Sequence, residues 1–369
     1  MGGTRDAGVP RHGRPGPGRF ADARALTRPA LALADAVPFA AGGLAVAHPR
    51  VVTVLLLSLA GLLVSTHGRL LDALDGLPGD RINPIRRASP LVRGQVSPVV
   101  VAMAAAAAGL AVTIGALLLV PTVTHGLGFA GLVVLRTLQV TARRVTAAPT
   151  ARAMVRVAQW LADAVVPTLA PAAGVPLGVL AAGGRPGVEA FVLAAGFALG
   201  AAVTGATVVG LRDLPIDRLT GRLTTALITG VRLRRPNGFV FPSRYVMLVC
   251  AAQAGLLIAV AVVVGFGLAD DPGTPTAGHG LAACSALAAA LVAAIGLVHL
   301  LRSGAPGLDP VQRRPPSPPG AGFTLMNLLA CHLAAIAWLL TTPGALPWWT
   351  SPPVLVGWAL TAAMWVRPR

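Results

Sequence analysis

Residues 51–80 read VVTVLLLSLAGLLVSTHGRLLDALDGLPGD, an apolar run that ends in three aspartates. The apolar part is about 20 residues long, which is the length a helix needs to cross a bilayer core about 30 Å thick. Asp72 and Asp75 are three residues apart, so they share one face of a helix. Asp80 follows a Gly-Leu-Pro-Gly segment, for which we predict a turn that folds the chain back. The stretch therefore predicts a membrane span whose end presents carboxylates.

A second stretch of the same form, DLPIDRLTG at residues 213–221, also follows a long apolar segment. Asp213 and Asp217 are four residues apart and again share a helix face. The chain has 13 acidic residues, and five of them lie in these two stretches. The first motif (Asp72, Asp75 and Asp80) and the second motif (Asp213 and Asp217) lie four predicted helices apart, which suggests two similar half-bundles that face each other.

The composition excludes an ordinary soluble protein. The mean hydropathy is +0.73, and 12% of the 369 residues are charged. We predict an all-α, polytopic transmembrane helical bundle of nine to ten spans, a single domain over residues 29–369, behind a disordered, Arg-, Gly- and Pro-rich cytoplasmic leader over residues 1–28. The candidate spans are 29–48, 50–70, 97–120, 124–142, 157–182, 187–210, 243–268, 279–301, 323–341 and 352–367. The last is short, so nine spans with a re-entrant tail is the alternative.

Arginine accounts for all of the basic charge, because the chain contains 30 Arg and no Lys and has a net charge of +17. The arginines gather in the loops after the second, fourth, sixth and eighth spans, while the other loops are nearly free of them, Arg185 excepted. Basic loops stay on the cytoplasmic side, so we expect a multi-pass protein of the plasma membrane with both aspartate motifs at its cytoplasmic face. This distribution argues against a nucleic-acid partner, since no single soluble face carries the charge.

Carboxylates beside arginines suit one kind of chemistry. Mg²⁺ prefers oxygen ligands and commonly binds one or two carboxylates together with substrate phosphates. Two facing carboxylate clusters could hold Mg²⁺ against one diphosphate, and arginines would add charge-assisted hydrogen bonds to its oxygens. An allylic diphosphate could then ionise, because the charge that develops on the leaving group is stabilised. The alternative is that these are solvated loop carboxylates that neutralise nearby arginines.

The flanking residues resemble a known family. Residues 80–97, DRINPIRRASPLVRGQVS, are similar to the segment after the first aspartate motif of UbiA-type membrane prenyltransferases, where NDxxDxxxD runs into Arg-Pro-Leu, Gly and Ser. Residues 213–221, with Thr224, resemble that family's second motif, DxxxD followed by Gly and Thr. The first motif departs from the pattern in two ways. Leu71 replaces the usual Asn, and the spacing from Asp75 to Asp80 is one residue longer.

The resemblance implies a helical bundle that transfers a prenyl group from a prenyl diphosphate to a hydrophobic, aromatic or lipid acceptor, with Mg²⁺ as cofactor and membrane lipids as surroundings. By resemblance the metal ligands are Asp72, Asp75, Asp80, Asp213 and Asp217. Four of these, Asp72, Asp75, Asp213 and Asp217, are also the implied catalytic residues. The implied diphosphate-binding residues are Arg86, Arg87, Arg93 and Arg212. Two alternatives stay open: a UbiA-like terpene cyclase and a non-catalytic lipid-binding member. Few charges within the spans argue against a transporter.

Other polar residues fall inside the predicted spans. Asp163 either binds the acceptor or pairs with an arginine between helices. His67, one turn before the first motif, either touches substrate or is structural. For the remaining ones we expect hydrogen bonds between helices; these are Gln253, His299, Asn327 and His332.

Overall fold

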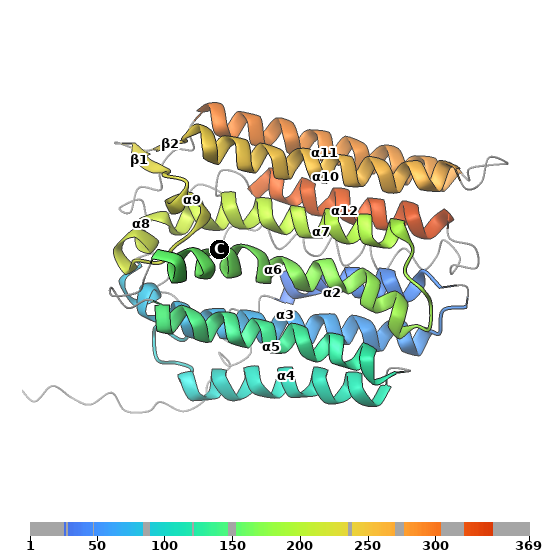
Figure 1. Ribbon diagram of the computed structural model, residues 1–369, viewed down its shortest axis with the longest axis horizontal. Coiled ribbons are helices and arrows are strands. Elements are labelled where there is room, and N and C mark those ends of the chain that lie inside the picture. The colour runs from blue at the N-terminus through green and yellow to red at the C-terminus, as the bar shows by residue number, and fades with distance from the viewer. Residues whose placement is uncertain are drawn as a thin grey trace, which may run out of the picture.

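The chain forms one bundle of long helices that lie side by side (Figure 1). The computed structural model describes residues 26, 29–46, 48–83, 89–119, 122–146, 153–234, 238–269, 277–303 and 321–341. The long helices are α2 (Pro29–Leu44), α3 (Val51–Ile82), α4 (Pro98–Leu119), α5 (Val123–Thr146), α6 (Ala153–Ala181), α7 (Val188–Thr204), α10 (Ser243–Ala269), α11 (Ala277–Ser303) and α12 (Ala321–Thr341). The shorter elements are η2 (Gly205–Val209), α8 (Gly210–Thr220), α9 (Thr225–Ile228), β1 (Arg232–Arg234) and β2 (Gly238–Val240).

The predicted helical bundle is confirmed. Among the described residues, seven helical segments are long and apolar enough to cross a membrane, judged by length and composition. In one of them, Val188–Thr220, the elements α7, η2 and α8 follow one another without a break. The predicted count of nine to ten spans is supported only roughly, since α2 has 16 residues and the apolar helix Met326–Leu340 is also short. The predicted span 352–367 and the predicted leader, apart from Leu26, lie outside the described residues.

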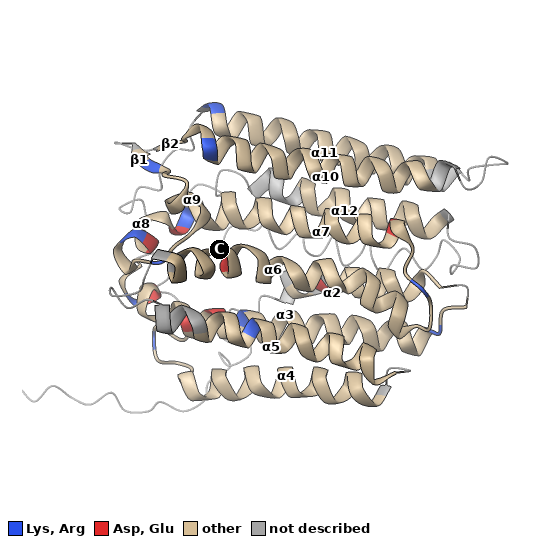
Figure 2. Ribbon diagram, viewed as in Figure 1, with Lys and Arg blue, Asp and Glu red and all other residues tan. Residues whose placement is uncertain are grey.

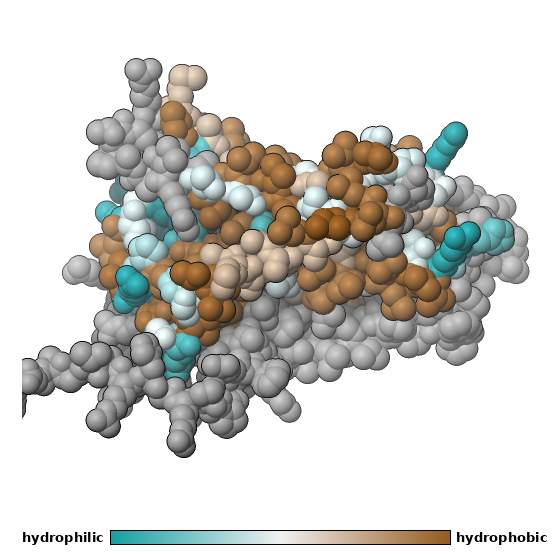
Figure 3. All heavy atoms as spheres, turned by 90° about the horizontal axis from the view of Figure 1, so that it is seen from below, coloured by the Kyte–Doolittle hydropathy of each residue, from teal (hydrophilic) through white to brown (hydrophobic). Residues whose placement is uncertain are grey.

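The surface fits a lipid environment. Large apolar side chains are exposed along the helices, among them Leu110 at 60% and Leu118 at 77% on α4. In Figure 3 brown, apolar atoms cover the middle of the visible face, and teal, hydrophilic ones lie toward its two ends. Figure 2 shows that charged residues gather at the end of the bundle that carries α8, α9 and the strands. This is the distribution expected of a bundle whose flanks face hydrocarbon.

The backbones of α2 and α6 approach each other closely. A Cβ atom added at Gly178 would lie 2.5 Å from the carbonyl oxygen of Phe39 and 3.0 Å from Cα of Gly42. Gly174, one turn earlier on α6, leaves room for Pro38 and Phe39 in the same way. Small residues at this spacing let membrane helices touch through their backbones, where dispersion and weak polar contacts hold them together. The sequence reasoning above did not use this Gly-x-x-x-Gly pattern.

Buried polar residues also join the helices. Gln253 on α10 and Asn327 on α12 exchange two amide hydrogen bonds, each 2.9 Å long, which confirms the expected interhelical contact. The buried ring of His332 on α12 lies next to the Ala34 backbone on α2, but no hydrogen bond of ordinary geometry joins them, so its expected interhelical bond stays a prediction. His67 is 4% exposed and bridges helices, with Nδ1 2.8 Å from the Ala105 carbonyl oxygen. Its Nε2 lies 3.1 Å from the Thr137 hydroxyl, so its contacts are structural.

One local prediction is corrected. The Gly-Leu-Pro-Gly segment does not fold the chain back, because α3 continues through Pro78 to Ile82. Proline lacks only its own N–H, and near the end of a helix that loss removes one hydrogen bond without stopping the last turn. A small antiparallel pair of strands, β1 and β2, follows α9 and pairs Leu233 with Phe239; it is a local addition to the all-α bundle.

Candidate functional site

Helix length carries both aspartate motifs toward one end of the bundle. The 32 residues of α3 span about 48 Å at 1.5 Å per residue, more than the core of a bilayer at about 30 Å. The continuous segment Val188–Thr220 has 33 residues and similarly exceeds the core. Each of these over-long segments carries one motif near its C-terminal end. The two ends meet, since a Cβ atom added at Gly79 would lie 3.4 Å from Ile216 and 3.6 Å from Thr220.

The second motif lies on α8, whose position depends on the π-turn η2. The hydroxyl of Tyr245 donates a 3.0 Å hydrogen bond to the Ala206 carbonyl inside that turn. Tyr245 is fully buried, and its ring stacks on Phe241 with centroids 5.4 Å apart. The single tyrosine of the chain thus fixes the turn that leads into the motif. At the other end, Gly221 adopts a left-handed φ of 71° and its N–H bonds the Asp217 carbonyl, which ends α8.

A salt bridge dominates the second motif. Arg212 donates to both carboxylate oxygens of Asp213, each bond being 2.8 Å long. The same guanidinium is within electrostatic reach of Asp80 and Asp217. Asp217 is only 5% exposed, so it is a buried acid and not the wet loop carboxylate of the alternative interpretation. Arg212 therefore joins the end of the first motif to both acids of the second.

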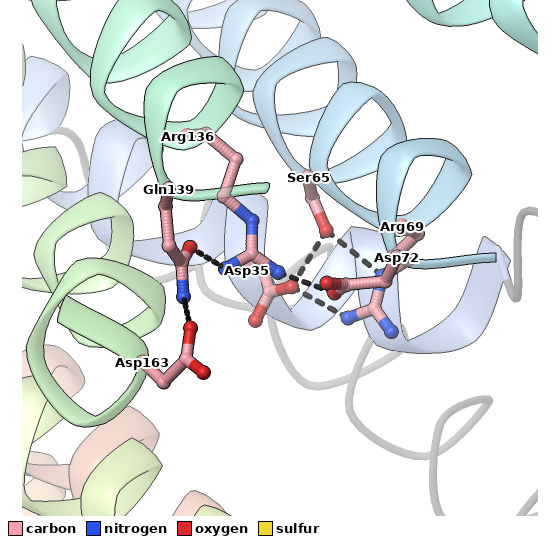
Figure 4. A network of polar contacts seen from close by, with 7 residues as sticks. All are labelled: Asp35, Ser65, Arg69, Asp72, Arg136, Gln139 and Asp163. Atoms are coloured by element: carbon pink, nitrogen blue, oxygen red, sulfur yellow. Dashed lines mark hydrogen bonds and ion pairs between the residues drawn. The ribbon is translucent and has the colours of Figure 1, made fainter. Parts of the chain in front are cut away.

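The first motif is tied to α5 and α6. Asp72 accepts a hydrogen bond from Arg136 on α5, and Arg136 also donates to Gln139 (Figure 4). Gln139 in turn donates to Asp163 on α6 over 2.9 Å. Asp163 therefore contacts an amide and lies in a chain of polar contacts that ends at Asp72. The two predicted roles of Asp163, acceptor binding and an ion pair with an arginine, both stay predictions.

A second polar group lies one helical turn before Asp72. Arg69 donates to Asp35 on α2 over 2.6 Å, and Ser65 donates to the same carboxylate oxygen over 2.6 Å. Arg69 also donates to the Ser65 hydroxyl over 3.0 Å. Figure 4 shows this group beside the contacts of Asp72 and Arg136.

The sequence reasoning missed Arg69 and Arg136 and took charges within the spans to be few. A signal was present, since each lies in an apolar run, and an ionised residue at that depth is costly unless it is paired. Asp35 was not among the predicted site residues. Asp35, Arg69, Arg136 and Asp163 lie on α2, α3, α5 and α6, so four different helices carry these charges.

The predicted diphosphate-binding arginines fall into three groups. Arg86 and Arg87 lie outside the described residues. Arg93 lies in a short turn and is exposed, and no described contact joins its side chain to either motif. Arg212 lies between the two motifs as described above. Asp75 and Asp80 are half-buried on α3, so all five predicted carboxylates lie on α3 or α8.

The donor set suits a hard divalent cation, which takes oxygen ligands. Within the described part of the chain, no group of three or more His, Cys, Asp or Glu side chains is close enough to enclose a metal. That does not conflict with Mg²⁺, because Mg²⁺ usually takes one or two carboxylates and completes its shell with water and substrate phosphates. Asp217 and Asp80, both near Arg212, fit such a shared arrangement with a bound anion.

Comparisons with known proteins identify the fold. No protein-family model matches the sequence, and no curated protein sequence matches it. A UbiA homologue from Archaeoglobus fulgidus, solved with DMAPP and Mg²⁺, is similar in structure with a TM-score of 0.58 at 15% identity, over 86% of this chain and 99% of that one. A UbiA homologue from Aeropyrum pernix K1 gives 0.57 at 16% identity, over 83% and 96%. A digeranylgeranylglyceryl phosphate synthase structure gives 0.56 at 10%, over 89% and 99%. The chain has the UbiA-type fold.

Proposed function

We propose that this membrane protein of UbiA-type fold is a prenyltransferase that moves an isoprenoid from a prenyl diphosphate to a hydrophobic acceptor, with a divalent metal, Mg²⁺, as cofactor. The observation that carries the proposal is the meeting of the two aspartate motifs around Arg212, at the ends of two over-long helices. Structures of similar fold support it, since the homologue from A. fulgidus was solved with DMAPP and Mg²⁺ and also with GPP and Mg²⁺.

In this proposal the carboxylates of Asp72, Asp75, Asp80, Asp213 and Asp217 hold the metal. When bound, the metal neutralises the diphosphate and so stabilises the charge that it gains on leaving. Arg212 lies where it can bond the same oxygens, and its charge is already balanced by Asp213 when the substrate is absent. The allylic C–O bond breaks, the diphosphate keeps the electron pair, and the acceptor forms the new bond to that carbon and releases a proton to water.

The isoprenoid and the acceptor are both lipid-soluble, so both can reach the site from the bilayer, and the diphosphate lies at the polar end of the bundle. The first test is binding of geranyl diphosphate (GPP) to the detergent-purified protein by calorimetry. We expect the affinity to require Mg²⁺ or Mn²⁺ and to fall at least about tenfold in EDTA, because carboxylates repel an unshielded diphosphate. Equal affinity with and without EDTA would rule out the metal-dependent site. Turnover of GPP to a hydrocarbon without added acceptor would instead indicate a cyclase.

We further propose that the polar end of the bundle faces the cytoplasm at the plasma membrane, on the basis of the arginine-rich loops. A variant lacking Cys250, Cys284 and Cys331, with a single new cysteine in residues 89–97 or in residues 221–231, tests this in inverted and right-side-out vesicles. Both positions are expected to react with an impermeant maleimide only in inverted vesicles. Labelling of the two segments from opposite sides would contradict the shared site.

A further inference from the structure

Arg136 is a cation inside the described bundle that was not among the predicted site residues. It lies on α5 within a candidate membrane span, Val123–Thr141, and its side chain is 14% exposed. An arginine at that depth indicates function by default. Its contact is with Asp72, a predicted catalytic and metal-binding residue.

Besides Asp72, two neighbours on α3 and α5 hold the guanidinium in place. Gly68 leaves the surface of α3 bare, since a Cβ atom there would lie 3.1 Å from Nε of Arg136. Gln139, 3% exposed, presents its carbonyl oxygen to the guanidinium. The amide of Gln139 is oriented by Asp163, because an ionised carboxylate only accepts hydrogen bonds and so selects the NH₂ group.

Held in this way, Arg136 still has donors to spare. A guanidinium carries five N–H groups, and the described contacts join Arg136 to two acceptors, Asp72 and Gln139. The other three N–H groups can donate to a further acceptor. Phosphate oxygens are the acceptors that a planar guanidinium fork matches best.

We propose that Arg136 is a diphosphate-binding residue that exchanges partners. Without substrate it pairs with Asp72. When the diphosphate binds, its oxygens displace Asp72 from Arg136, and the carboxylate becomes available to the metal. Gln139 and Asp163 act as positioning residues that hold the guanidinium for both partners. The inference rests on the proposed function and adds a residue and an order of events to it.

If the partners exchange in this way, Asp72→Asn should change the affinity for GPP in opposite directions with and without metal. In EDTA, Asp72 only competes with the diphosphate for Arg136. Asp72→Asn should therefore raise the affinity for GPP in EDTA by about tenfold, the effect of losing one charge-assisted bond. With Mg²⁺ the same variant should bind GPP more weakly than the unmodified protein, because a metal ligand is lost.

The experiment measures Kd for GPP and for inorganic diphosphate by calorimetry, with Mg²⁺ and with EDTA. Arg136→Gln should weaken both ligands by about tenfold or more and should abolish the gain that Asp72→Asn gives in EDTA. Gln139→Met, similar in size but without the amide, should weaken both ligands equally and by less. A merely structural effect on binding of the isoprenoid chain would change GPP binding alone. Arg185→Gln, which removes the same charge at the other end of the bundle, should change neither.

Each result decides the question. If Arg136→Gln does not fold, Arg136→Lys is compared in its place, and we expect weaker binding of both ligands, since an ammonium cannot supply the fork. Unchanged binding in every Arg136 variant, or no gain from Asp72→Asn in EDTA, overturns the exchange while Mg²⁺-dependent GPP binding leaves the proposed function standing. Absence of Mg²⁺-dependent binding in the unmodified protein is the separate failure of the proposed function.

Discussion

Replacing Asp217 by asparagine is expected to lower kcat for prenyl transfer by about 100- to 1,000-fold, or about 3–4 kcal/mol, the scale of losing one main electrostatic stabiliser. Asp217 is buried, interacts with Arg212 and lies across from the first motif. Asparagine keeps the shape but removes the charge, so the metal and Arg212 each lose a negative partner. Asp75→Asn should act on the same ionisation step with a similar loss. The double variant should be little worse than either single one, because residues that work as a unit are not additive.

The measurement is single-turnover product formation from GPP with an acceptor-containing membrane extract, beside thermal denaturation of each variant. Glu189→Gln is the matched control, since Glu189 is the acid in the first turn of α7, at the opposite end of the same continuous segment. It should keep full activity. Normal activity in Asp75→Asn together with loss in Asp217→Asn would mean that the altered first motif no longer takes part, and full activity in both would discard the two-motif site.

Replacing Gly178 by valine should destabilise the protein by about 3 kcal/mol or more, enough to remove most of the folded protein from detergent. The new Cβ would fall 2.5 Å from the carbonyl oxygen of Phe39. That neighbour is backbone and cannot rotate away, so α2 and α6 must separate. Separation would also shift Asp35, which α2 holds against Arg69, so residual folded protein should lose activity as well.

Gly115→Val on α4 is the control, because no atom lies within 4 Å of the Cβ position there. Size-exclusion chromatography after heating gives the apparent melting temperature of both variants. A Gly178→Val protein as stable as Gly115→Val would show that the two backbones do not touch in the membrane.

How much could be predicted depended on the range of the interaction. Apolar length is a local property, so the bundle and most helix boundaries follow from the sequence, and the arginine-rich loops follow with them. The end of α3 was misjudged because Gly76, Pro78 and Gly79 read as a turn, whereas packing against Ile216 and Thr220 on α8 favours a continued helix. Local propensity is a weak guide when tertiary contacts compensate for it.

The site was predictable in its acids and not in its cations. The aspartates form short motifs that can be read directly along the chain. Arg136 and Arg69 form no motif, and each acquires meaning only through a partner on another helix. The pairing of Asp72 with Arg136 spans 64 residues, and nothing in the spacing along the chain indicates which arginine reaches which carboxylate.

The π-helical turn at Gly205–Val209 determines the direction in which the side chains of α8 point. An α-helix advances by about 100° around its axis for every residue. If the same residues wound through this turn as ordinary α-helix, the extra residue that the wider π-turn accommodates would rotate everything after it, and the carboxylates of Asp213 and Asp217 would point about 100° away from their present direction. Every side chain of the site would be intact, yet α8 would no longer present the same face to α3. The hydroxyl of Tyr245 is not among the predicted site residues, yet its hydrogen bond to this turn helps to fix the direction in which the second motif points.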